Sequence, residues 1–219
     1  PPPPLPVQLR FMPRLTVDSV GHRFGPLVLF RRLSFTLDGG QSVAITGSNG
    51  SGKSTLLRIL AGVLTPRAGE VTLTVDGEVV PPEGRPLRTG LVAPYLNVYD
   101  GLSAQENLAF LAEARQLSNA APRIEAALDQ VGLAGRTGDL VGTYSSGMKQ
   151  RVKYAAALLA DPPLLLLDEP SANLDEAGLA MVDRVMDRQR ARERLLVVAT
   201  NVAEEAARCD RAVCVEDYR

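Results

Sequence analysis

Apolar residues recur along this chain with two spacings, and each spacing predicts a different kind of element. Residues 14–20 alternate between apolar and polar, as in a half-buried strand, and the apolar run at 164–167 is typical of a strand buried on both faces. The predicted strands are Arg14–Val20, Val28–Leu37, Ser42–Thr46, Glu70–Val75, Glu78–Val80, Leu91–Ala93, Leu164–Leu167, Leu195–Ala199 and Ala212–Val215. The predicted helices are Ser54–Ala61, Ser103–Gln116, Arg123–Val131, Met148–Ala160, Glu176–Arg192 and Ala203–Ala207.

Two local signals support this assignment. Asp76-Gly77 predicts the tight turn of a hairpin between two of the strands. Ser103 followed by Glu106 predicts a capping box at the start of a helix. The order of the elements predicts an α/β core with a helical insertion over about residues 94–162. Residues 1–13 are interpreted as a proline-rich tail and residues 14–219 as one domain.

Composition narrows the classes of function. The 219 residues are 45% apolar and carry a net charge of −1, so the chain is globular and no overall field favours nucleic acid. Two cysteines, Cys209 and Cys214, exclude a disulfide scaffold and are expected to fill the core. The single histidine, His22, is expected at the surface, and a zinc site is not expected. No apolar run approaches the length of a membrane span.

A glycine-rich segment between a predicted strand and a predicted helix indicates a phosphate site. It matches the pattern G-x-x-x-x-G-K-S, in which backbone N–H groups and the helix N-terminus surround phosphate oxygens. In this pattern Lys53 reaches the β- and γ-phosphates of a nucleotide, and the Ser54 hydroxyl binds Mg²⁺. The segment consists of Gly47, Ser48, Asn49, Gly50, Ser51, Gly52, Lys53, Ser54 and Thr55.

An acidic pair follows the buried strand 164–167. Ligands of open parallel sheets sit beyond the carboxyl ends of the strands, where Asp168 and Glu169 would lie. Asp168 can hold Mg²⁺ through water, and Glu169 can act as the general base toward an attacking water. The two segments together predict hydrolysis of a nucleotide.

The chain resembles an ABC-transporter ATP-binding subunit over about residues 14–215. Tyr144-Ser145-Ser146-Gly147-Met148 is similar to the L-S-G-G-Q signature of ABC ATPases, and Ser171–Asp175 is similar to the family's D-loop. With the phosphate loop and the acidic pair, four motifs stand in the family's order. The resemblance implies a P-loop NTPase core, an N-terminal antiparallel β subdomain and an inserted helical subdomain.

The resemblance also implies roles for single residues. Phe24 stands where the family has an aromatic ring that stacks on adenine. Two ATPase subunits of the family pair head to tail, so Ser145, Ser146 and Gly147 would meet the γ-phosphate held by the partner. Asp175 would communicate across that interface. The implied cofactors are ATP and Mg²⁺. The implied partners are a second ATPase subunit, a second copy of this chain being favoured, and a separate membrane permease.

Two positions depart from the family pattern. Pro94 stands where the family has the glutamine of a metal-sensing loop, and Asn97 and Gln105 are the two residues that could substitute for it. Asn201 replaces the usual histidine after the strand 195–199, and its amide can donate a hydrogen bond but cannot carry charge. Two interpretations follow, slowed hydrolysis or a degenerate site that mainly binds ATP. The first is favoured because Lys53, Ser54, Asp168, Glu169 and the signature remain.

The leading hypothesis is therefore an ATPase, the energising subunit of an ABC transporter, with export favoured. It would be cytoplasmic and bound to the inner face of a membrane through its permease, which would dock around residues 94–103. One alternative is a regulatory, ATP-dependent dimerisation module with little turnover. A further alternative, an ABC ATPase acting on ribosomes or DNA, fits poorly with 219 residues and a net charge of −1.

Overall fold

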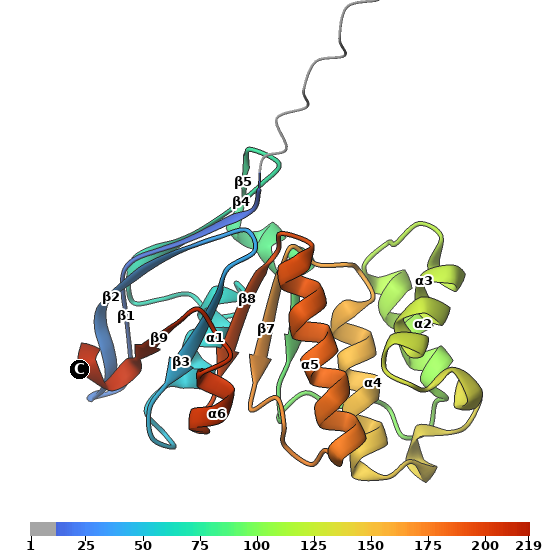
Figure 1. The fold of residues 1–219 in the computed structure, drawn as a ribbon. Coiled ribbons are helices and arrows are strands. Elements are labelled where there is room, and N and C mark those ends of the chain that lie inside the picture. Colours follow the sequence, from blue (N-terminus) through green and yellow to red (C-terminus); the bar gives the residue numbers. More distant parts are fainter. Residues whose placement is uncertain (1–11) are drawn as a thin grey trace, which may run out of the picture.

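The structure is a computed structural model that describes residues 12–219, folded as two sheets with helices packed around them (Figure 1). Of the proline-rich tail predicted for residues 1–13, residues 1–11 lie outside the described range.

The first sheet is antiparallel and has the strand order β2-β1-β4-β5. Its strands are β1 (Arg14–Phe24), β2 (Leu27–Asp38), β4 (Ala68–Val75) and β5 (Glu78–Val80). The predicted hairpin turn is confirmed between β4 and β5, where Asp76 and Gly77 both have positive φ angles. That backbone conformation favours aspartate and glycine over other residues.

The second sheet is parallel and has the order β6-β7-β8-β3-β9. Its strands are β6 (Thr89–Val92), β7 (Leu164–Asp168), β8 (Leu195–Ala199), β3 (Ser42–Thr46) and β9 (Arg211–Cys214). All residues of β7 and β8 are buried, which confirms that these apolar runs form strands covered on both faces.

The helices cover the parallel sheet on both sides (Figure 1). The predicted capping box of α2 is confirmed, because Ser103 and Glu106 exchange both of its hydrogen bonds. The α-helices are α1 (Lys53–Leu60), α2 (Ala104–Ala114), α3 (Ala120–Gln130), α4 (Ser146–Leu158), α5 (Glu176–Ala191) and α6 (Ala203–Ala206). Short 3-10 turns are η1 (Pro82–Arg88), η2 (Ala134–Arg136), η3 (Val141–Thr143) and η4 (Val215–Tyr218).

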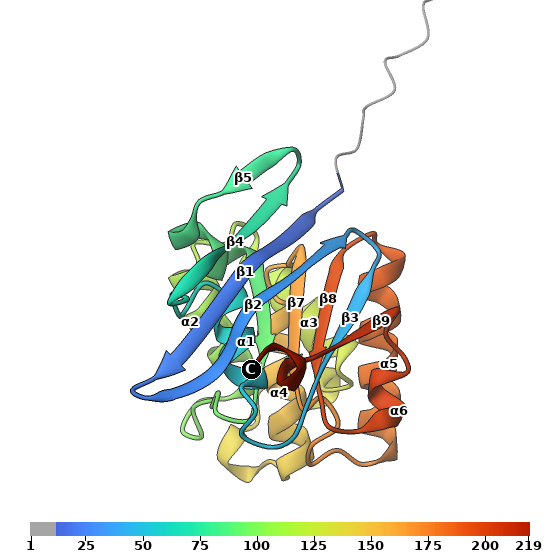
Figure 2. The same cartoon turned by 90° about the vertical axis from the view of Figure 1, so that its left-hand side faces the viewer.

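Two hydrophobic cores meet at the parallel sheet. Leu164 and Leu166 of β7 face a core shared with the antiparallel sheet and α1. Leu165 and Leu167 face a second core formed with α2, α3, α4 and α5. The alternate residues of β7 therefore pack the antiparallel sheet against one face of the parallel sheet and the helical region against the other. Figure 2 shows the antiparallel sheet crossing the parallel sheet, with α1 between them.

His22 is buried, and its expected surface position is wrong. Its side chain is only 4% exposed. Strand β1 extends beyond the predicted end at Val20 because its pairing with β2 slips at several points, and these bulges turn His22 inward opposite Phe30. The two cysteines are half-buried, and Cys209 packs against the core of the helical region.

Candidate functional site

The motifs identified in the sequence gather at the carboxyl edge of the parallel sheet. The phosphate loop follows β3, Asp168 ends β7, and Asn201 is the second residue after β8. These strands are neighbours, because β8 pairs with both β7 and β3. Parallel strands end at the same edge, so segments far apart in the sequence surround one space there.

Lys53 lies inside the phosphate loop. Its side chain is 6% exposed, and its Nζ donates hydrogen bonds to the carbonyl oxygens of Gly47 at 2.8 Å and Ser48 at 3.1 Å. The loop curls because Gly47, Gly50 and Gly52 have φ angles of 139°, 80° and 113°, which L side chains rarely adopt. The Lys53 ammonium group is thus held by the backbone carbonyl groups of the phosphate loop.

Donors in this loop remain available to an anion. Helix α1 begins without a side-chain cap at Gly52, so the N–H groups of its first turn have no side-chain acceptor there. The Ser51 hydroxyl is buried and has no hydrogen-bond partner in the part of the chain that the structure describes. These groups, the helix dipole and Lys53 together favour a phosphate.

Asp168 and Ser54 form a pair suited to a magnesium ion. Asp168 is 2% exposed and lies close to the Ser54 hydroxyl. Burial raises the pKa of Asp168, and the nearby Ser54 hydroxyl opposes that rise. Its second oxygen, Oδ2, is buried and has no partner among residues 12–219. A carboxylate oxygen without a partner beside a hydroxyl is the donor chemistry that Mg²⁺ prefers, so these residues fit the ion.

Glu169 is exposed at the end of β7 and has a φ angle of 51°. A left-handed conformation at a glutamate is strained and needs support from its surroundings. The support comes from its own N–H, which donates to the Ala199 carbonyl, and from the buried Tyr154, whose hydroxyl donates to the Pro170 carbonyl at 2.9 Å. The carboxylate therefore projects from a fixed backbone beside Asp168.

Asn201 contacts the phosphate loop directly. Its Nδ2 donates to the Asn49 Oδ1 at 3.2 Å. The replacement for the family's histidine thus lies at the loop. The position of Asn201 is set by the preceding residue, Thr200, which directly follows β8. The N–H of Thr200 donates to the Ile45 carbonyl of β3.

Glu216, in η4 at the end of the chain, was missed by the sequence reasoning. Its Oε1 accepts a hydrogen bond from the Ser48 hydroxyl at 2.5 Å, and this bond lowers the pKa of Glu216. The only signal in the sequence was its place just after the last strand of the sheet, which puts it at the same edge as the phosphate loop.

Phe24 lies at the end of β1 and is 52% exposed. Its ring contacts the ring of His22 edge to face, with the centroids 4.9 Å apart. The other side of the ring is available to solvent, which fits a stacking surface for a base.

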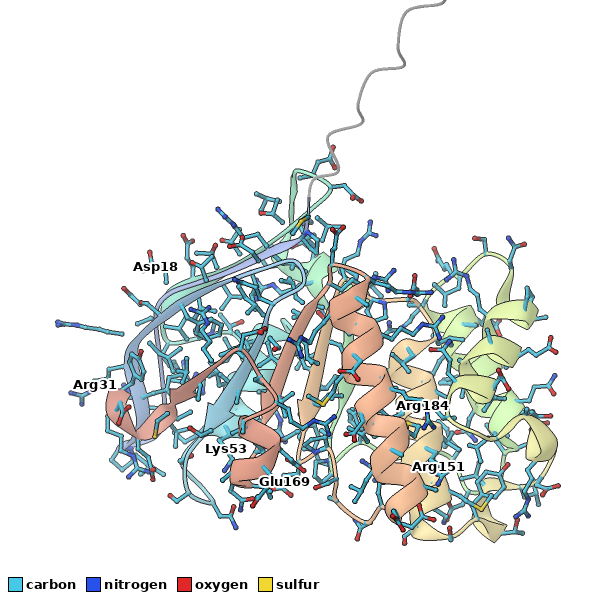
Figure 3. All side chains as sticks on the ribbon, viewed as in Figure 1. Asp18, Arg31, Lys53, Arg151, Glu169 and Arg184 are labelled. Carbon is cyan, nitrogen blue, oxygen red and sulfur yellow. The ribbon has the colours of Figure 1, made fainter. Side chains whose placement is uncertain are left out.

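The signature residues lie at the N-terminus of α4. Ser145 caps the helix by accepting from the Met148 N–H, and Ser146 is exposed at its first turn. No hydrogen bond joins Ser145, Ser146 or Gly147 to the phosphate loop within the described range. In Figure 3, Arg151 of α4 lies well away from Lys53, on the far side of Glu169.

Asp175 ties the D-loop to the signature helix. It caps α5 by accepting from the Gly178 N–H at 2.8 Å and accepts from Arg151 at 3.0 Å, and both bonds lower the pKa of Asp175. The carbonyl of Asn173 lies so close to Gly147 that a Cβ there would approach it to 3.3 Å. The two motifs are therefore packed as one unit.

Pro94 occupies the loop between β6 and α2, and its carbonyl accepts from Lys153 at 3.5 Å. The guanidinium of Arg58 stacks over the ring of Tyr95, 4.0 Å from its centroid. Neither substitute for the family's glutamine reaches Asp168 or Lys53 by a hydrogen bond in residues 12–219. Asn97 lines a groove described next, and Gln105 is exposed on α2.

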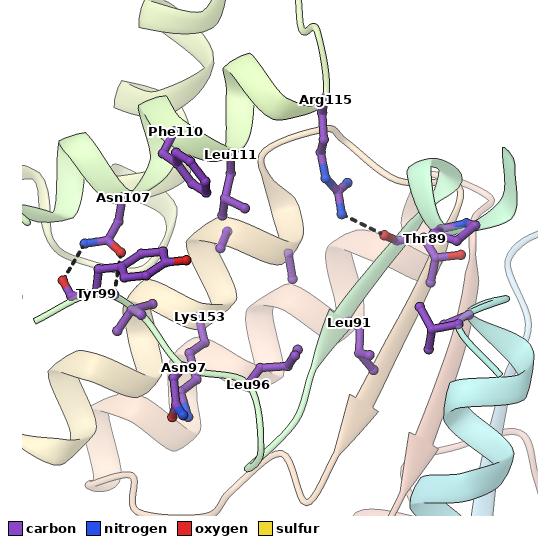
Figure 4. A pocket seen from close by; sticks show the side chains of 16 residues that line it. Thr89, Leu91, Leu96, Asn97, Tyr99, Asn107, Phe110, Leu111, Arg115 and Lys153 are labelled. Carbon is purple, nitrogen blue, oxygen red and sulfur yellow. Dashed lines mark hydrogen bonds between the residues drawn. The ribbon is translucent and has the colours of Figure 1, made fainter. Parts of the chain in front are cut away.

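A largely apolar groove of about 290 Å³ lies between α1, β6, α2 and α4 (Figure 4). Exposed Tyr99 and Phe110 stand at one side with their rings edge to face, 5.8 Å apart. At the other end, Arg115 donates to the Thr89 carbonyl at 3.5 Å, and its Nη1 is buried without a partner in the described chain. Asn107 holds the Tyr99 backbone through bonds of 2.8 and 3.0 Å.

None of the helices in residues 12–219 is long and apolar enough to cross a membrane.

Comparison with known proteins decides the family. The family model described as ABC transporter matches residues 30–172. The chain belongs to the ABC transporter family. The cytochrome c biogenesis ATP-binding export protein CcmA of Brucella abortus is 37% identical over 193 residues, 86% of this chain and 86% of that protein. The Nod factor export ATP-binding protein I of Burkholderia lata is 34% identical over 215 residues, 95% of this chain and 70% of that protein.

Solved structures agree with this family. A structure described as the ATP-binding subunit of an ABC transporter has a TM-score of 0.80 at 29% identity, over 91% of this chain and 85% of that chain. The predicted α/β fold, with its antiparallel β region and parallel sheet, is confirmed. The chain is thus an ATP-binding ATPase subunit of this family, whose subunits work with a membrane permease.

Proposed function

We propose that this chain hydrolyses MgATP between two ATPase subunits paired head to tail and thereby drives export through a separate permease. The observation that carries the proposal is the separation of two half-sites in one chain. The phosphate loop has its lysine, its metal pair and its carboxylate, whereas no hydrogen bond among residues 12–219 joins the signature to them. A partner subunit in reverse orientation brings the missing half.

The residues of the phosphate loop divide the binding of ATP among them. The backbone of Gly47–Thr55, including Ser48, Asn49, Gly50, Ser51 and Gly52, surrounds the phosphates, and Lys53 neutralises the β- and γ-phosphates. Ser54 and Asp168 hold Mg²⁺, which supplies positive charge to the phosphates when bound. Phe24 stacks on adenine.

Hydrolysis follows from the fixed carboxylate. Glu169 accepts a proton from the attacking water, which adds to the γ-phosphate while the bond to ADP breaks. Asn201 donates a hydrogen bond to the γ-phosphate and Lys53 stabilises the charge that develops. Ser145, Ser146 and Gly147 of the second subunit close the site with the N-terminus of α4.

The groove between α2 and α4 fits the docking of a permease helix. Apolar walls favour the buried face of a short helix, and the unpartnered nitrogen of Arg115 requires an acceptor from the occupant. The groove also includes Leu96 and Asn97, from the loop that carries Pro94. Lys153 donates to the Pro94 carbonyl of this loop, and Arg58 stacks on the ring of Tyr95. A helix that enters the groove would thus contact a loop that packs against α1, the helix that begins at Lys53.

Export is favoured by the names of the relatives, CcmA and the Nod factor exporter, which are both described as export proteins. Such a subunit acts at the cytoplasmic face of a membrane, held there by its permease. Two copies of this chain form the simplest pair.

The concentration dependence of MgATP turnover tests the pair. If the active species is a dimer, turnover rises more steeply than linearly with the concentration of the purified chain. A strictly linear increase, with monomers only in light scattering under saturating MgATP, contradicts the proposal.

Docking is tested separately on native membranes. Phe110→Asp places a charge in the groove and should release the subunit into the supernatant. Leu140→Asp, at an equally exposed apolar residue outside the groove, is the matched control. Equal retention of both variants contradicts docking at this groove.

A further inference from the structure

The antiparallel sheet is distorted beside Phe24. The pairing of β1 with β2 slips three times between Val17 and Arg23. Ser19 and Arg32, on the two strands, have left-handed φ angles of 51° and 53°. This distortion breaks the alternation of inward and outward residues, so that Arg31 and Arg32 are both exposed. Strained backbone of this kind is a feature of binding sites.

A hollow of about 360 Å³ lies over the distortion. Four arginines line it, and its lining contains no carboxylate. None of the four forms an ion pair within residues 12–219, and Arg23 donates to the Gly25 carbonyl at 2.9 Å. The four are Arg23, Arg31, Arg32 and Arg67.

His22 provides a second, independent observation. It lines the same hollow, is 4% exposed, and its Nδ1 has no hydrogen-bond partner in the described part of the chain. Burial lowers the pKa of His22, and the charge of Arg67 lowers it further. A buried nitrogen without a partner is costly in a folded protein, unless a ligand completes it.

We propose that this hollow is an anion site that binds a phosphate group through the arginines and His22. Guanidinium groups match phosphate oxygens with paired N–H donors, and an imidazole that gains a proton adds another donor. The residues involved are separate from the phosphate loop of the ATP site. The site is therefore a second phosphate site, and it does not depend on the function proposed above.

The position of the hollow allows two sources of phosphate, a free anion or the headgroup of a phospholipid. Val63 lines the groove between α2 and α4, and Arg67 lines the hollow, so one short segment connects the two. In Figure 2 the closed end of the β1–β2 hairpin projects toward the side of the molecule that carries η1 and α2.

The single histidine makes the test direct, because its imidazole signals in an NMR spectrum need no assignment. The full chain is first saturated with a non-hydrolysable ATP analogue and Mg²⁺, which fills the other phosphate site. Inorganic phosphate is then titrated. We expect saturable shifts of the His22 signals and a higher pKa of the imidazole, because a bound anion favours the imidazolium.

Two double variants distinguish phosphate binding at this hollow from a general effect of the protein's positive charge. R31Q/R32Q should weaken phosphate binding by about tenfold or more, the scale of losing charge-assisted hydrogen bonds. R184Q/R188Q removes the same charge from α5, on the other side of the molecule in Figure 3, and should leave the affinity unchanged. Unshifted His22 signals in the wild-type chain, or equal weakening in both variants, overturns the proposal.

Flotation with vesicles identifies whether the bound phosphate group belongs to a lipid or to a free anion. Vesicles of phosphatidylcholine are compared with vesicles that also contain phosphatidylglycerol. Binding of the wild-type chain to the anionic vesicles alone, lost in R31Q/R32Q and kept in R184Q/R188Q, supports the site and assigns it to lipid headgroups. Phosphate binding without vesicle binding supports the site and assigns it to a free anion.

Discussion

The phosphate loop and the signature are both small, polar segments at helix N-termini, yet the fold surrounds them differently. At the first, Lys53 and Asp168 are nearly buried, and the Glu216 carboxylate of η4 and the Asn201 amide, which follows β8, both contact the loop. At the second, Ser145 and Ser146 are exposed, and the Ser145 hydroxyl accepts from the Met148 N–H of its own helix. The same local chemistry thus yields one nearly complete site and one open surface.

The difference teaches that a helix N-terminus alone does not define where chemistry occurs. The phosphate loop is at the edge where five parallel strands end, so groups distant in sequence converge on it. The signature lies on a helix of the helical region, where the D-loop packs against it, and no hydrogen bond among residues 12–219 links it to the phosphate loop. The pairing proposed above would supply its complement from a second subunit.

Glu169→Gln is expected to have the largest effect. The loss of the general base should lower kcat by about 10²–10⁴-fold, while ATP binding remains. Steady-state MgATP hydrolysis and equilibrium nucleotide binding measure the two effects. Glu125→Gln, at an exposed glutamate of α3, is the control. Turnover equal to that of the wild type would show that the base has been misassigned.

Ser146→Arg should separate the two half-sites. A long cation at the exposed first turn of α4 obstructs the partner, so turnover should fall by about hundredfold, the scale of losing a transition-state donor. Binding of ATP to the monomer should be retained, because the phosphate loop is untouched. Ser118→Arg, in the turn after α2, controls for the added charge. If Ser146→Arg turns over normally, the signature does not act on a partner's ATP.

Asn201→His should raise turnover by about tenfold, since a charged donor stabilises the transition state by about 1.4 kcal/mol more than a neutral one. Asn201→Ala should lower it, because the hydrogen bond is lost. Single-turnover measurements of the γ-phosphate release compare the three chains. A histidine variant no faster than the alanine variant would assign Asn201 to holding Asn49 instead.

Asp168→Asn should have the smallest effect, a slight stabilisation of the metal-free protein at neutral pH. Burial raises the pKa of Asp168 in the folded state, so the folded form prefers the neutral acid and loses stability as pH rises through that range. The amide removes this cost, and the gain should vanish below about pH 3.9, where an ordinary aspartate is also protonated.

Thermal unfolding without metal, at neutral and acid pH, measures the effect of Asp168→Asn. The exposed Asp187→Asn of α5 serves as the control. A lower melting temperature for Asp168→Asn at neutral pH would mean that the carboxylate stabilises the fold as well as the metal site.

Much of the fold was predictable because apolar residues recur regularly along most strands and helices. The strands at 42–46 and 195–199 and the capping box of Ser103 were predicted at the observed positions. Strand β1 was predicted too short, because its bulges interrupt the alternation on which the prediction rests. The same bulges bury His22, which sequence reasoning placed at the surface.

The sequence by itself determined the chemistry of the phosphate loop and the acidic pair, because glycine spacing and a carboxylate at a strand end are local properties. Only the tertiary structure decided which residues complete them. The Glu216 contact with Ser48 and the Asn201 contact with Asn49 join residues more than a hundred positions apart, brought together by the order of strands in the parallel sheet. No local pattern encodes that order, since it depends on which apolar faces pack against one another.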